Sequence, residues 1–280
     1  MFYRHITPQR IAAFRDFLTA EERCPATIEK YLRDVRSLSN FLNGHTVTKE
    51  RASAWKESLA RDYAPASVNA MVAAVNKFLT FQGWNDCRLK PLRLQRRLFR
   101  EDRRELTKAE YDCLLQTAQA LGRERLALLM EAICSTGIRV SEVRYLTVEA
   151  AAAGRTEISL KGKVRTILLP QKLCRKLLKF ARKRQISVGE IFRTRAGTSL
   201  SRKQIWAEMK ALCRRAGVSP SKVFPHNLRH LFARTFYRVT RDVAKLADIL
   251  GHSSIETTRI YLISTGSEHA QTLELLRLIS

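Results

Sequence analysis

Seven residues of types that serve phosphate chemistry follow one another along the second half of the chain. They are Arg139, Glu142, Lys161, His226, Arg229, His252 and Tyr261. Arginine pairs two phosphate oxygens and never deprotonates, so it suits an anion whose charge grows in the transition state. A phenol can attack phosphorus, and neighbouring arginines favour its phenolate form. A lysine can give the proton that an alkoxide leaving group needs. Together these types are suited to chemistry at a phosphate group, with Tyr261 as a candidate attacking group.

Most of these residues have a plain structural interpretation when taken alone. Arg139 and Glu142 lie three apart on an expected helix, where a surface ion pair is the usual outcome. His226 and Arg229 also share one helical face. Lys161 occupies the tip of an expected hairpin, which is normally solvated. Only the order of the whole set argues for chemistry.

The stretch "LGHSSIETTRIY" ends this series of residues. His252 precedes Ser253, and the spacing from Ser253 to Glu256 is that of a capping box, so we expect a helix to begin at Ser253. Tyr261 would lie on that helix, where a tyrosine usually packs in the core. The alternative is that Tyr261 is the attacking group.

Four motifs occur in a distinctive order, namely "TGIRVSEV", "LKGKVR", "HNLRH" and "LGHSSIETTRIY". In this order they resemble the tyrosine recombinase (phage integrase) family over about residues 106–262. Residues 1–85 resemble the family's helical core-binding domain through weaker motifs. The resemblance implies a site-specific DNA recombinase that cuts and rejoins duplex DNA.

The resemblance also implies how the scissile phosphate is held. Arg139 and Arg229 would clamp its non-bridging oxygens. His226 would hydrogen-bond the same phosphate and assist proton movement, and His252 would donate to a phosphate oxygen. Glu142 would orient the neighbouring groups.

Two further roles complete the expected reaction. Tyr261 would attack phosphorus and become a 3′-phosphotyrosine, which stores the bond so that rejoining needs no ATP. Lys161 would protonate the leaving 5′ oxygen. Lys163 follows on the same hairpin, so an exchange of roles between the two lysines stays open.

The charge of the chain points to the same partner. There are 51 Lys+Arg against 26 Asp+Glu, a formal net charge of +25. A field of this size attracts a polyanion, and nucleic acid is the default, although a merely basic protein is the alternative. Besides the catalytic set, we expect basic or amide side chains along both halves to contact double-stranded DNA: Lys30, Arg33, Asn69, Arg96, Arg97, Arg100, Arg103, Arg104, Lys163, Arg165, Arg202 and Lys203.

Hydrophobic periodicity predicts a mainly α-helical protein with a small antiparallel β-sheet. Residues 1–90 read as a helical bundle that serves as the core-binding domain, and residues 91–105 as an Arg-rich linker. Residues 106–280 read as a mixed α/β catalytic domain of the tyrosine recombinase type. Capping boxes at Thr107 and Ser201 mark helix starts, "TEISLKGKVRTILLP" reads as a hairpin, and residues 267–280 carry an apolar helix face.

Several other features are expected to be absent. We find no acidic cluster suited to metal ions and no nucleotide-binding loop, so we expect no cofactor. No apolar run is long enough for a membrane span, and no signal peptide is apparent, so we expect a cytoplasmic protein of bacterial type. The six scattered cysteines are expected to be thiols.

The resemblance leaves three questions of function open. A type IB topoisomerase would share the catalytic set, and a DNA-binding protein that no longer cuts would share the charge. Among recombinases, we favour integration or excision of a bacterial mobile element over Xer-like resolution of chromosome dimers. The family assembles as a dimer on each site and a tetramer in the synapse, and the C-terminal helix is expected to dock in trans on a neighbouring protomer.

Overall fold

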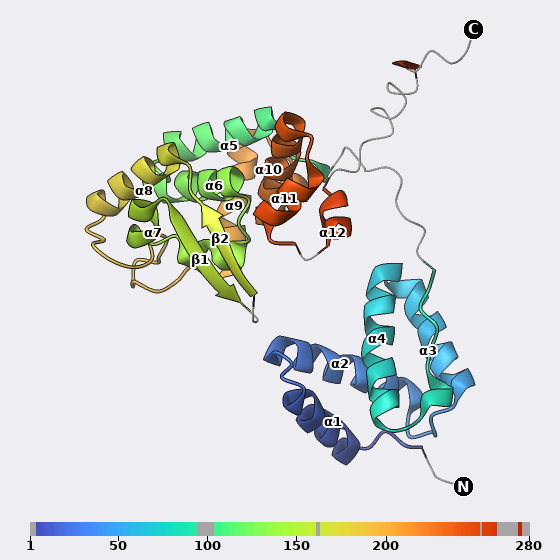
Figure 1. Ribbon diagram of the computed structural model, residues 1–280. Coiled ribbons are helices and arrows are strands. Elements are labelled where there is room, and N and C mark those ends of the chain that lie inside the picture. The colour runs from blue at the N-terminus through green and yellow to red at the C-terminus, as the bar shows by residue number, and fades with distance from the viewer. Residues whose placement is uncertain (1–3, 94–103, 161–162, 253, 262–273, 276–280) are drawn as a thin grey trace. The chain divides into compact units, whose positions relative to one another are not determined.

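The computed structural model describes residues 4–93, 104–160, 163–252, 254–261 and 274–275 (Figure 1). Contacts group the chain into two compact units, Met1–Arg96 and Arg97–Ser280. The boundary between the units falls inside the expected linker, of which residues 94–103 lie outside the described part. The units are therefore taken one at a time.

Four helices and a short 3₁₀ turn form the first unit: α1 (Pro8–Ala20), α2 (Pro25–Leu42), α3 (Lys49–Asp62), α4 (Pro65–Phe81) and η1 (Asn85–Cys87). The helix starts follow from local chemistry. Thr7 caps α1 by accepting from the backbone N–H of Arg10, with Pro8 at the first helical position, as the sequence predicts. Thr48 caps α3 in the same way.

Aromatic packing holds this bundle together. Phe14 of α1 is fully buried and meets Phe78 of α4 edge to face, with ring centroids 5.3 Å apart. Trp55 of α3 is also buried, and its indole N–H donates to the Ser37 hydroxyl of α2. Apolar stripes from all four helices thus converge on one core.

Two asparagines of α4 bind the segment that leaves the bundle. The Asn69 amide donates to the Leu92 carbonyl and accepts from the Leu92 N–H, at 2.9 and 2.7 Å. Asn76, two turns further on, makes the same pair of bonds to Leu89. Because both ends of its amide are used on backbone, Asn69 has a structural role here that the expected DNA contact did not foresee.

The two other residues expected to contact DNA from this unit flank a buried carboxylate. Asp34 is 1% exposed, and Lys30 pairs with it at 2.6 Å while also donating to the Ala70 carbonyl. Arg33 lies 3.5 Å from the same carboxylate but leaves 73% of its side chain exposed. Lys30 therefore neutralises a buried charge, and Arg33 keeps a guanidinium available to solvent.

The second unit is mainly helical with a two-stranded sheet, which confirms the expected fold class. Its described elements are α5 (Lys108–Ala120), α6 (Glu124–Thr136), η3 (Val140–Tyr145), α7 (Val148–Ala153), β1 (Arg155–Leu160), β2 (Lys163–Leu168), α8 (Gln171–Lys183), α9 (Arg202–Ala216), η4 (Pro220–Lys222), α10 (Pro225–Thr240), α11 (Val243–Leu250) and α12 (Ile255–Arg259). Helix α6 lies at the centre and packs against α5, α8, α9 and α10.

Several local predictions hold in this unit. Thr107 and Ser201 each form a complete capping box at the start of α5 and α9. Strands β1 and β2 pair antiparallel as the expected hairpin, from Arg155 opposite Leu168 to Leu160 opposite Lys163. The tip, residues 161–162, lies outside the described residues.

The prediction for the last helix is wrong in detail. The cap of α12 is Ser254, whose hydroxyl accepts from the Glu256 N–H, and the helix ends at Arg259. Tyr261 follows in a turn, with its N–H donating to the Thr258 carbonyl. The serine next along the chain takes the capping role, and the tyrosine lies just past the helix.

The end of the expected linker is bound to α10. The Asn227 side-chain amide donates to the Arg104 carbonyl at 2.7 Å. Arg234 forms an ion pair with the buried Glu105 and donates to the Leu106 carbonyl. The helix that carries the HNLRH motif is thus fixed to the segment that leads into α5.

No helix in the described ranges has the length and apolar character needed to cross a bilayer.

Candidate active site

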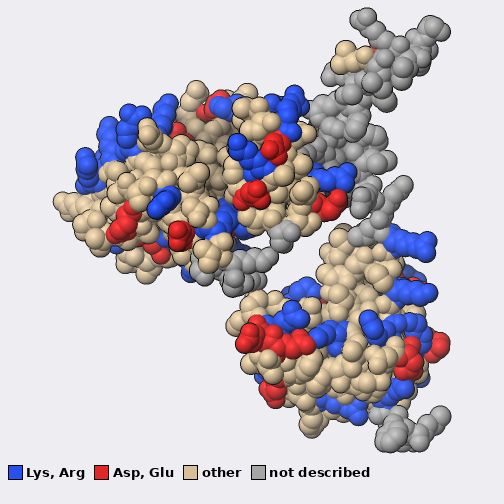
Figure 2. Space-filling model, in the orientation of Figure 1, with Lys and Arg blue, Asp and Glu red and all other residues tan. Residues whose placement is uncertain are grey.

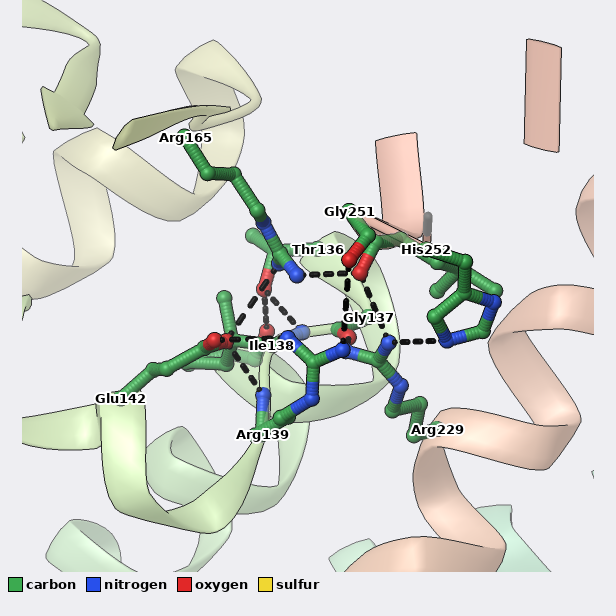
Figure 3. A network of polar contacts seen from close by, with 11 residues as sticks. Thr136, Gly137, Ile138, Arg139, Glu142, Arg165, Arg229, Gly251 and His252 are labelled. Atoms are coloured by element: carbon green, nitrogen blue, oxygen red, sulfur yellow. Dashed lines mark hydrogen bonds and ion pairs between the residues drawn. The ribbon is translucent and has the colours of Figure 1, made fainter. Parts of the chain in front are cut away.

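Residues from widely separated segments meet at one place in the second unit (Figure 3). Arg139 and Glu142 come from the start of η3, Arg229 comes from α10, and His252 comes from the loop after α11. Gly137 ends α6 in the left-handed conformation, with φ of +65°. A Cβ there would lie 2.4 Å from the Phe232 ring, so glycine is required for α6 and α10 to approach this closely.

Glu142 is a buried carboxylate that fixes Arg139. It is 3% exposed, and it accepts from the Arg139 backbone N–H at 2.8 Å and from the Arg139 guanidinium at 3.0 Å. Arg139 also donates to the Gly251 carbonyl at 3.4 Å, yet 42% of its side chain is exposed. The carboxylate thus aims a partly open guanidinium, which is the orienting role expected of Glu142.

Arg229 is 2% exposed and is held on every side. Its guanidinium donates to the carbonyls of Gly137 and Leu250 and to Nε2 of His252. Burial lowers the pKa of Arg229 to about 10, and the positive charge of Arg139 acts in the same direction, while contact with the Tyr261 hydroxyl opposes them. Arg229 therefore stays charged at neutral pH as a fixed cation beside the tyrosine.

The hydrogen bonds of His252 define its tautomer. Arginine has only donors, so Nε2 accepts from Arg229 at 2.9 Å, and the proton lies on Nδ1, which donates to the Thr258 hydroxyl at 2.8 Å. Nε2 is thus an acceptor in the DNA-free protein, whereas the role expected from the resemblance requires a donor. Donation to a phosphate needs that bond to be exchanged, and it stays a prediction.

The pKa of His252 is lowered to about 4 by burial and by the nearby charge of Arg229. Unfolded histidine binds a proton below about pH 6.5. Between that value and about 4, the unfolded chain binds more protons than the folded one. This group therefore makes folding less favourable as the pH falls through that window, and it is neutral at pH 7.

Tyr261 is buried among rings. It is 6% exposed and packs with Leu246 and Leu250 of α11. The His252 ring stacks on it at 5.5 Å between centroids, and the His226 ring meets it edge-on at 5.7 Å. The hydroxyl and Arg229 are in contact, so the expected nucleophile already lies inside the centre that its chemistry requires.

His230 is a site residue to which the sequence assigned no role. It is 7% exposed and lies one turn after His226 on α10, and its ring is 4.3 Å from that of Tyr261 and 4.5 Å from that of His226. The HNLRH motif contains this histidine at the i+4 spacing that places it beside His226. That spacing was the available signal.

Arg165 was expected to contact DNA, and the structure places it in the centre. Its side chain is 11% exposed, donates to the Leu250 carbonyl and lies 3.4 Å from Glu142. It lies against Gly251, where a Cβ would be 2.3 Å from its Cδ. Its Nε is buried with no hydrogen-bond partner in the described ranges. The bond from Arg165 to Leu250 spans 85 residues of sequence, and no local pattern reports such a contact.

Other expected residues are distributed outside the centre. Arg202 and Lys203 are exposed in the first turn of α9, and Arg104 is exposed just before α5. Lys163 begins β2, and nothing is described of its side chain. Lys161 lies outside the described residues, as do four arginines of the linker: Arg96, Arg97, Arg100 and Arg103.

The charge balance of the centre suits an anion. The centre holds three guanidinium groups, those of Arg139, Arg165 and Arg229, and one carboxylate, that of Glu142, which pairs with Arg139 and Arg165. Such a site stabilises negative charge that develops on phosphate oxygens next to a tyrosine. Within the part of the chain that the structure describes, no group of three or more His, Cys, Asp or Glu is placed to hold a metal ion.

Sequence comparisons find the same family across both units. The model of the phage integrase family matches residues 104–268, and that of its N-terminal SAM-like domain matches residues 11–85. The tyrosine recombinase XerA of Pyrococcus furiosus is 30% identical over 278 residues, covering 95% of this chain and 93% of its own. The tyrosine recombinase XerD of Xanthomonas campestris pv. campestris is 30% identical over 95% of this chain and 90% of its own.

Solved structures show the same fold at lower identity. XerH bound to its difH substrate superimposes with a TM-score of 0.67 at 18% identity, over 95% of this chain and 84% of that one. A lambda integrase tetramer on a Holliday junction superimposes with a TM-score of 0.72 at 17% identity, over 90% and 76%. The chain therefore belongs to the phage integrase family of tyrosine recombinases, enzymes that cut and rejoin DNA through a tyrosine intermediate.

Proposed function

We propose that this protein is a site-specific DNA recombinase in which Tyr261 is the nucleophile and Arg139 and Arg229 hold the scissile phosphate. The observation that carries the proposal is the contact between a buried, charged Arg229 and a buried tyrosine, with Arg139 held open to solvent beside them. Residues 1–90 serve as the core-binding domain and residues 106–280 as the catalytic domain.

The proposed reaction needs no group beyond those of the chain and the DNA. The Tyr261 hydroxyl gives up its proton to His226 as its oxygen bonds to phosphorus. The bond to the 5′ oxygen breaks, and Lys161 supplies the proton that the departing oxygen takes up. The guanidinium groups of Arg139 and Arg229 face the non-bridging oxygens as charge builds there. Glu142 keeps Arg139 aimed. Attack by a 5′ hydroxyl of another strand on the phosphotyrosine reverses the step and rejoins the DNA.

Covalent capture from a randomised library tests this proposal and yields the target sequence in the same experiment. The protein is incubated with nicked suicide duplexes whose central segment is randomised, and DNA that stays with the denatured protein is recovered and sequenced. We expect a consensus site, and a tryptic peptide containing Tyr261 that carries nucleotide. A nucleotide on another side chain refutes the assignment. Recovery of no adduct favours a DNA-binding protein that does not cut.

We expect His230 to position the nucleophile by packing its ring against that of Tyr261. Replacing His230 by alanine removes one wall of the Tyr261 pocket, and a misplacement of order 1 Å costs about 10²-fold in rate. Single-turnover adduct formation on the recovered duplex should fall by that order, while the DNA dissociation constant stays unchanged. Phenylalanine at 230 should restore most of the rate, because it keeps the ring.

A matched core variant separates this effect from loss of stability. Leu231 is 5% exposed on the same helix and packs in the main core of the unit. Leu231→Ala should lower the melting temperature without slowing adduct formation. If His230→Phe is as slow as His230→Ala, or if Leu231→Ala is equally slow, the ring contact of His230 is not the cause.

We expect adduct formation to be insensitive to metal removal. Fixed guanidinium groups occupy the place that Mg²⁺ takes in many nucleases. The rate in excess EDTA should match the rate in magnesium buffer when ionic strength is held constant. A rate that falls in EDTA and returns with added Mg²⁺ would contradict the cationic mechanism.

The assembly that we propose is a dimer on each site and a tetramer in the synapse, joined by the apolar tail at residues 267–280. A groove of about 540 Å³ among β2, α6, α10 and α11 suits such a helix, because apolar side chains such as Leu168, Phe232 and Phe236 line it. Deleting residues 267–280 should abolish synapsis and leave cleavage of a half-site suicide duplex in place. The tail lies outside the described residues apart from 274–275.

The biological subtype is open to a direct assay. The relatives named XerA and XerD fit chromosome dimer resolution, whereas a transposon integrase is among the similar folds and fits our preference for a mobile element. Plasmids with two copies of the recovered site report resolution, and pairs of unlike sites report integration. A topoisomerase would instead relax a supercoiled plasmid that lacks the site.

A further inference from the structure

Helix α8 carries a face of positive charge that the proposed reaction does not use. Six of the thirteen residues of Gln171–Lys183 are lysine or arginine, and none is acidic. Its other face is buried through Leu173, Leu177 and Phe180. The apolar residues are therefore committed to the core, and only the charged face meets solvent.

Two of these cations are already paired. Lys176 lies 2.6 Å from Glu131, and Lys183 lies 2.7 Å from Glu124, both on neighbouring α6. The other four are exposed and form no ion pair in the described part of the chain: Lys172, Arg175, Lys179 and Arg182. We call these four the α8 stripe.

The spacing of the α8 stripe places it along one line. Steps of three, four and three residues keep all four side chains on one helical face, and ten residues span about 15 Å. Like charges three or four apart on a helix repel one another, and a polyanion bound along the face relieves that repulsion. Duplex DNA carries a charge about every 1.7 Å of axis, so a length of about 15 Å offers each cation a phosphate.

This stripe is remote from the catalytic centre. Figure 1 shows α8 at one end of the second unit and α11 and α12 at the other, and Figure 2 shows lysine and arginine side chains gathered over the α8 end. Beyond the C-terminus of α8 lies an open hollow of about 960 Å³. Five arginines line this hollow: Arg123, Arg125, Arg184, Arg193 and Arg195. The two glutamates of that lining, Glu124 and Glu208, are paired with Lys183 and Arg125.

We propose that the α8 stripe is a second DNA-binding surface, which takes the phosphate backbone of duplex other than the segment held at the catalytic centre. This inference depends on the proposed function in one respect only, namely that the ligand is duplex DNA. The stripe supplies affinity and salt dependence without reading sequence, because lysine and arginine on phosphates do not distinguish bases.

Two double variants on the same helix give a matched test. The first double variant is Lys172→Gln/Lys179→Gln, and the second is Lys176→Gln/Lys183→Gln. Both remove two lysine charges that lie seven residues apart. Binding to a fluorescent 60-bp random-sequence duplex is measured across a salt series. We expect the first variant to lose about 2 from the slope of log affinity against log salt. The second variant should lose less than half of that, because its lysines are held by glutamates.

Duplex length distinguishes the two sources of the extra DNA. If the stripe holds DNA flanking the bound segment, the loss appears with a 60-bp duplex and vanishes with a 20-bp duplex. If it holds a second duplex, wild type binds two 20-bp duplexes per chain and the first variant binds one. Both results support the surface. The proposal is overturned if the two variants lose the same amount of slope, because the slope would then report only net charge. It is also overturned if neither variant loses any slope.

Cleavage is followed separately on the short duplex recovered by covalent capture. Both double variants should form adduct at the wild-type rate. If the first double variant changes the salt slope but wild type forms no adduct, the α8 stripe is supported and the proposed function is refuted. If wild type forms adduct but the slopes are unchanged, the proposed function is supported and the α8 stripe is refuted.

Discussion

Phenylalanine in place of Tyr261 is expected to abolish strand cleavage while leaving DNA affinity and folding intact. The substitution removes only the hydroxyl, and the ring keeps its contacts with His230, His252 and the side chains of α11. The centre then lacks the hydroxyl that contacts Arg229. Adduct formation, followed as a shift of labelled suicide duplex on a denaturing gel, should fall to background.

A second tyrosine provides the control. Tyr237 is half-buried in the same small cluster and carries the same hydroxyl. Tyr237→Phe should cleave at the wild-type rate, so a loss confined to Tyr261→Phe reports chemistry and not packing. Retention of a covalent adduct by Tyr261→Phe would remove the proposed nucleophile, whatever its effect on affinity.

Local sequence patterns were sufficient wherever neighbouring residues decide the structure. The Thr107 and Ser201 caps, the Thr7–Pro8 start and the hairpin each depend on side chains within a few positions, and all four agree with the structure. The prediction that the last helix begins at Ser253 failed, because Ser254 caps α12. His252 in that turn is bound to Arg229, so contacts from distant segments help to set the start of the helix.

The centre shows the same division between local and distant information. The motifs contain Arg139, Glu142 and Arg229, because the chemistry of phosphate calls for those types. Arg165 was expected only as a DNA contact, because the motifs give no sign that a strand arginine reaches the catalytic set. Only the folded chain shows that its guanidinium reaches Leu250 and Glu142.

Outside the centre, the asparagines of α4 show the same limit. Asn69 was expected to contact DNA, and the structure shows its side-chain amide bound to the backbone of Leu92. When a side chain binds the main chain, the type of the partner residue does not reveal the bond, because every residue other than proline offers the same N–H and C=O. Such contacts are therefore the part of a fold that sequence patterns report least.

Loss of either arginine of the clamp is expected to slow cleavage by orders of magnitude, but with different effects on stability. Removing one fixed donor from an oxyanion site costs about 10²–10³-fold in rate, so Arg139→Ala and Arg229→Ala should both show at least that loss. Arg139 leaves 42% of its side chain exposed, and its removal should barely change the melting temperature. Arg229 is buried and satisfies the carbonyls of Gly137 and Leu250.

Without Arg229 the Gly137 carbonyl loses its side-chain donor, and burying a carbonyl without a partner costs about 1–3 kcal/mol, whereas the Leu250 carbonyl keeps its hydrogen bond from Arg165. In a unit of this size, each kcal/mol of lost stability lowers the melting temperature by about 2–4 °C. Arg229→Lys separates the two effects, since an ammonium group keeps the charge but cannot form the planar fork. It should recover part of the stability and little of the rate. Near-normal cleavage by Arg139→Ala, or full activity of Arg229→Lys, would show that a two-oxygen clamp on the phosphate is not what drives the reaction.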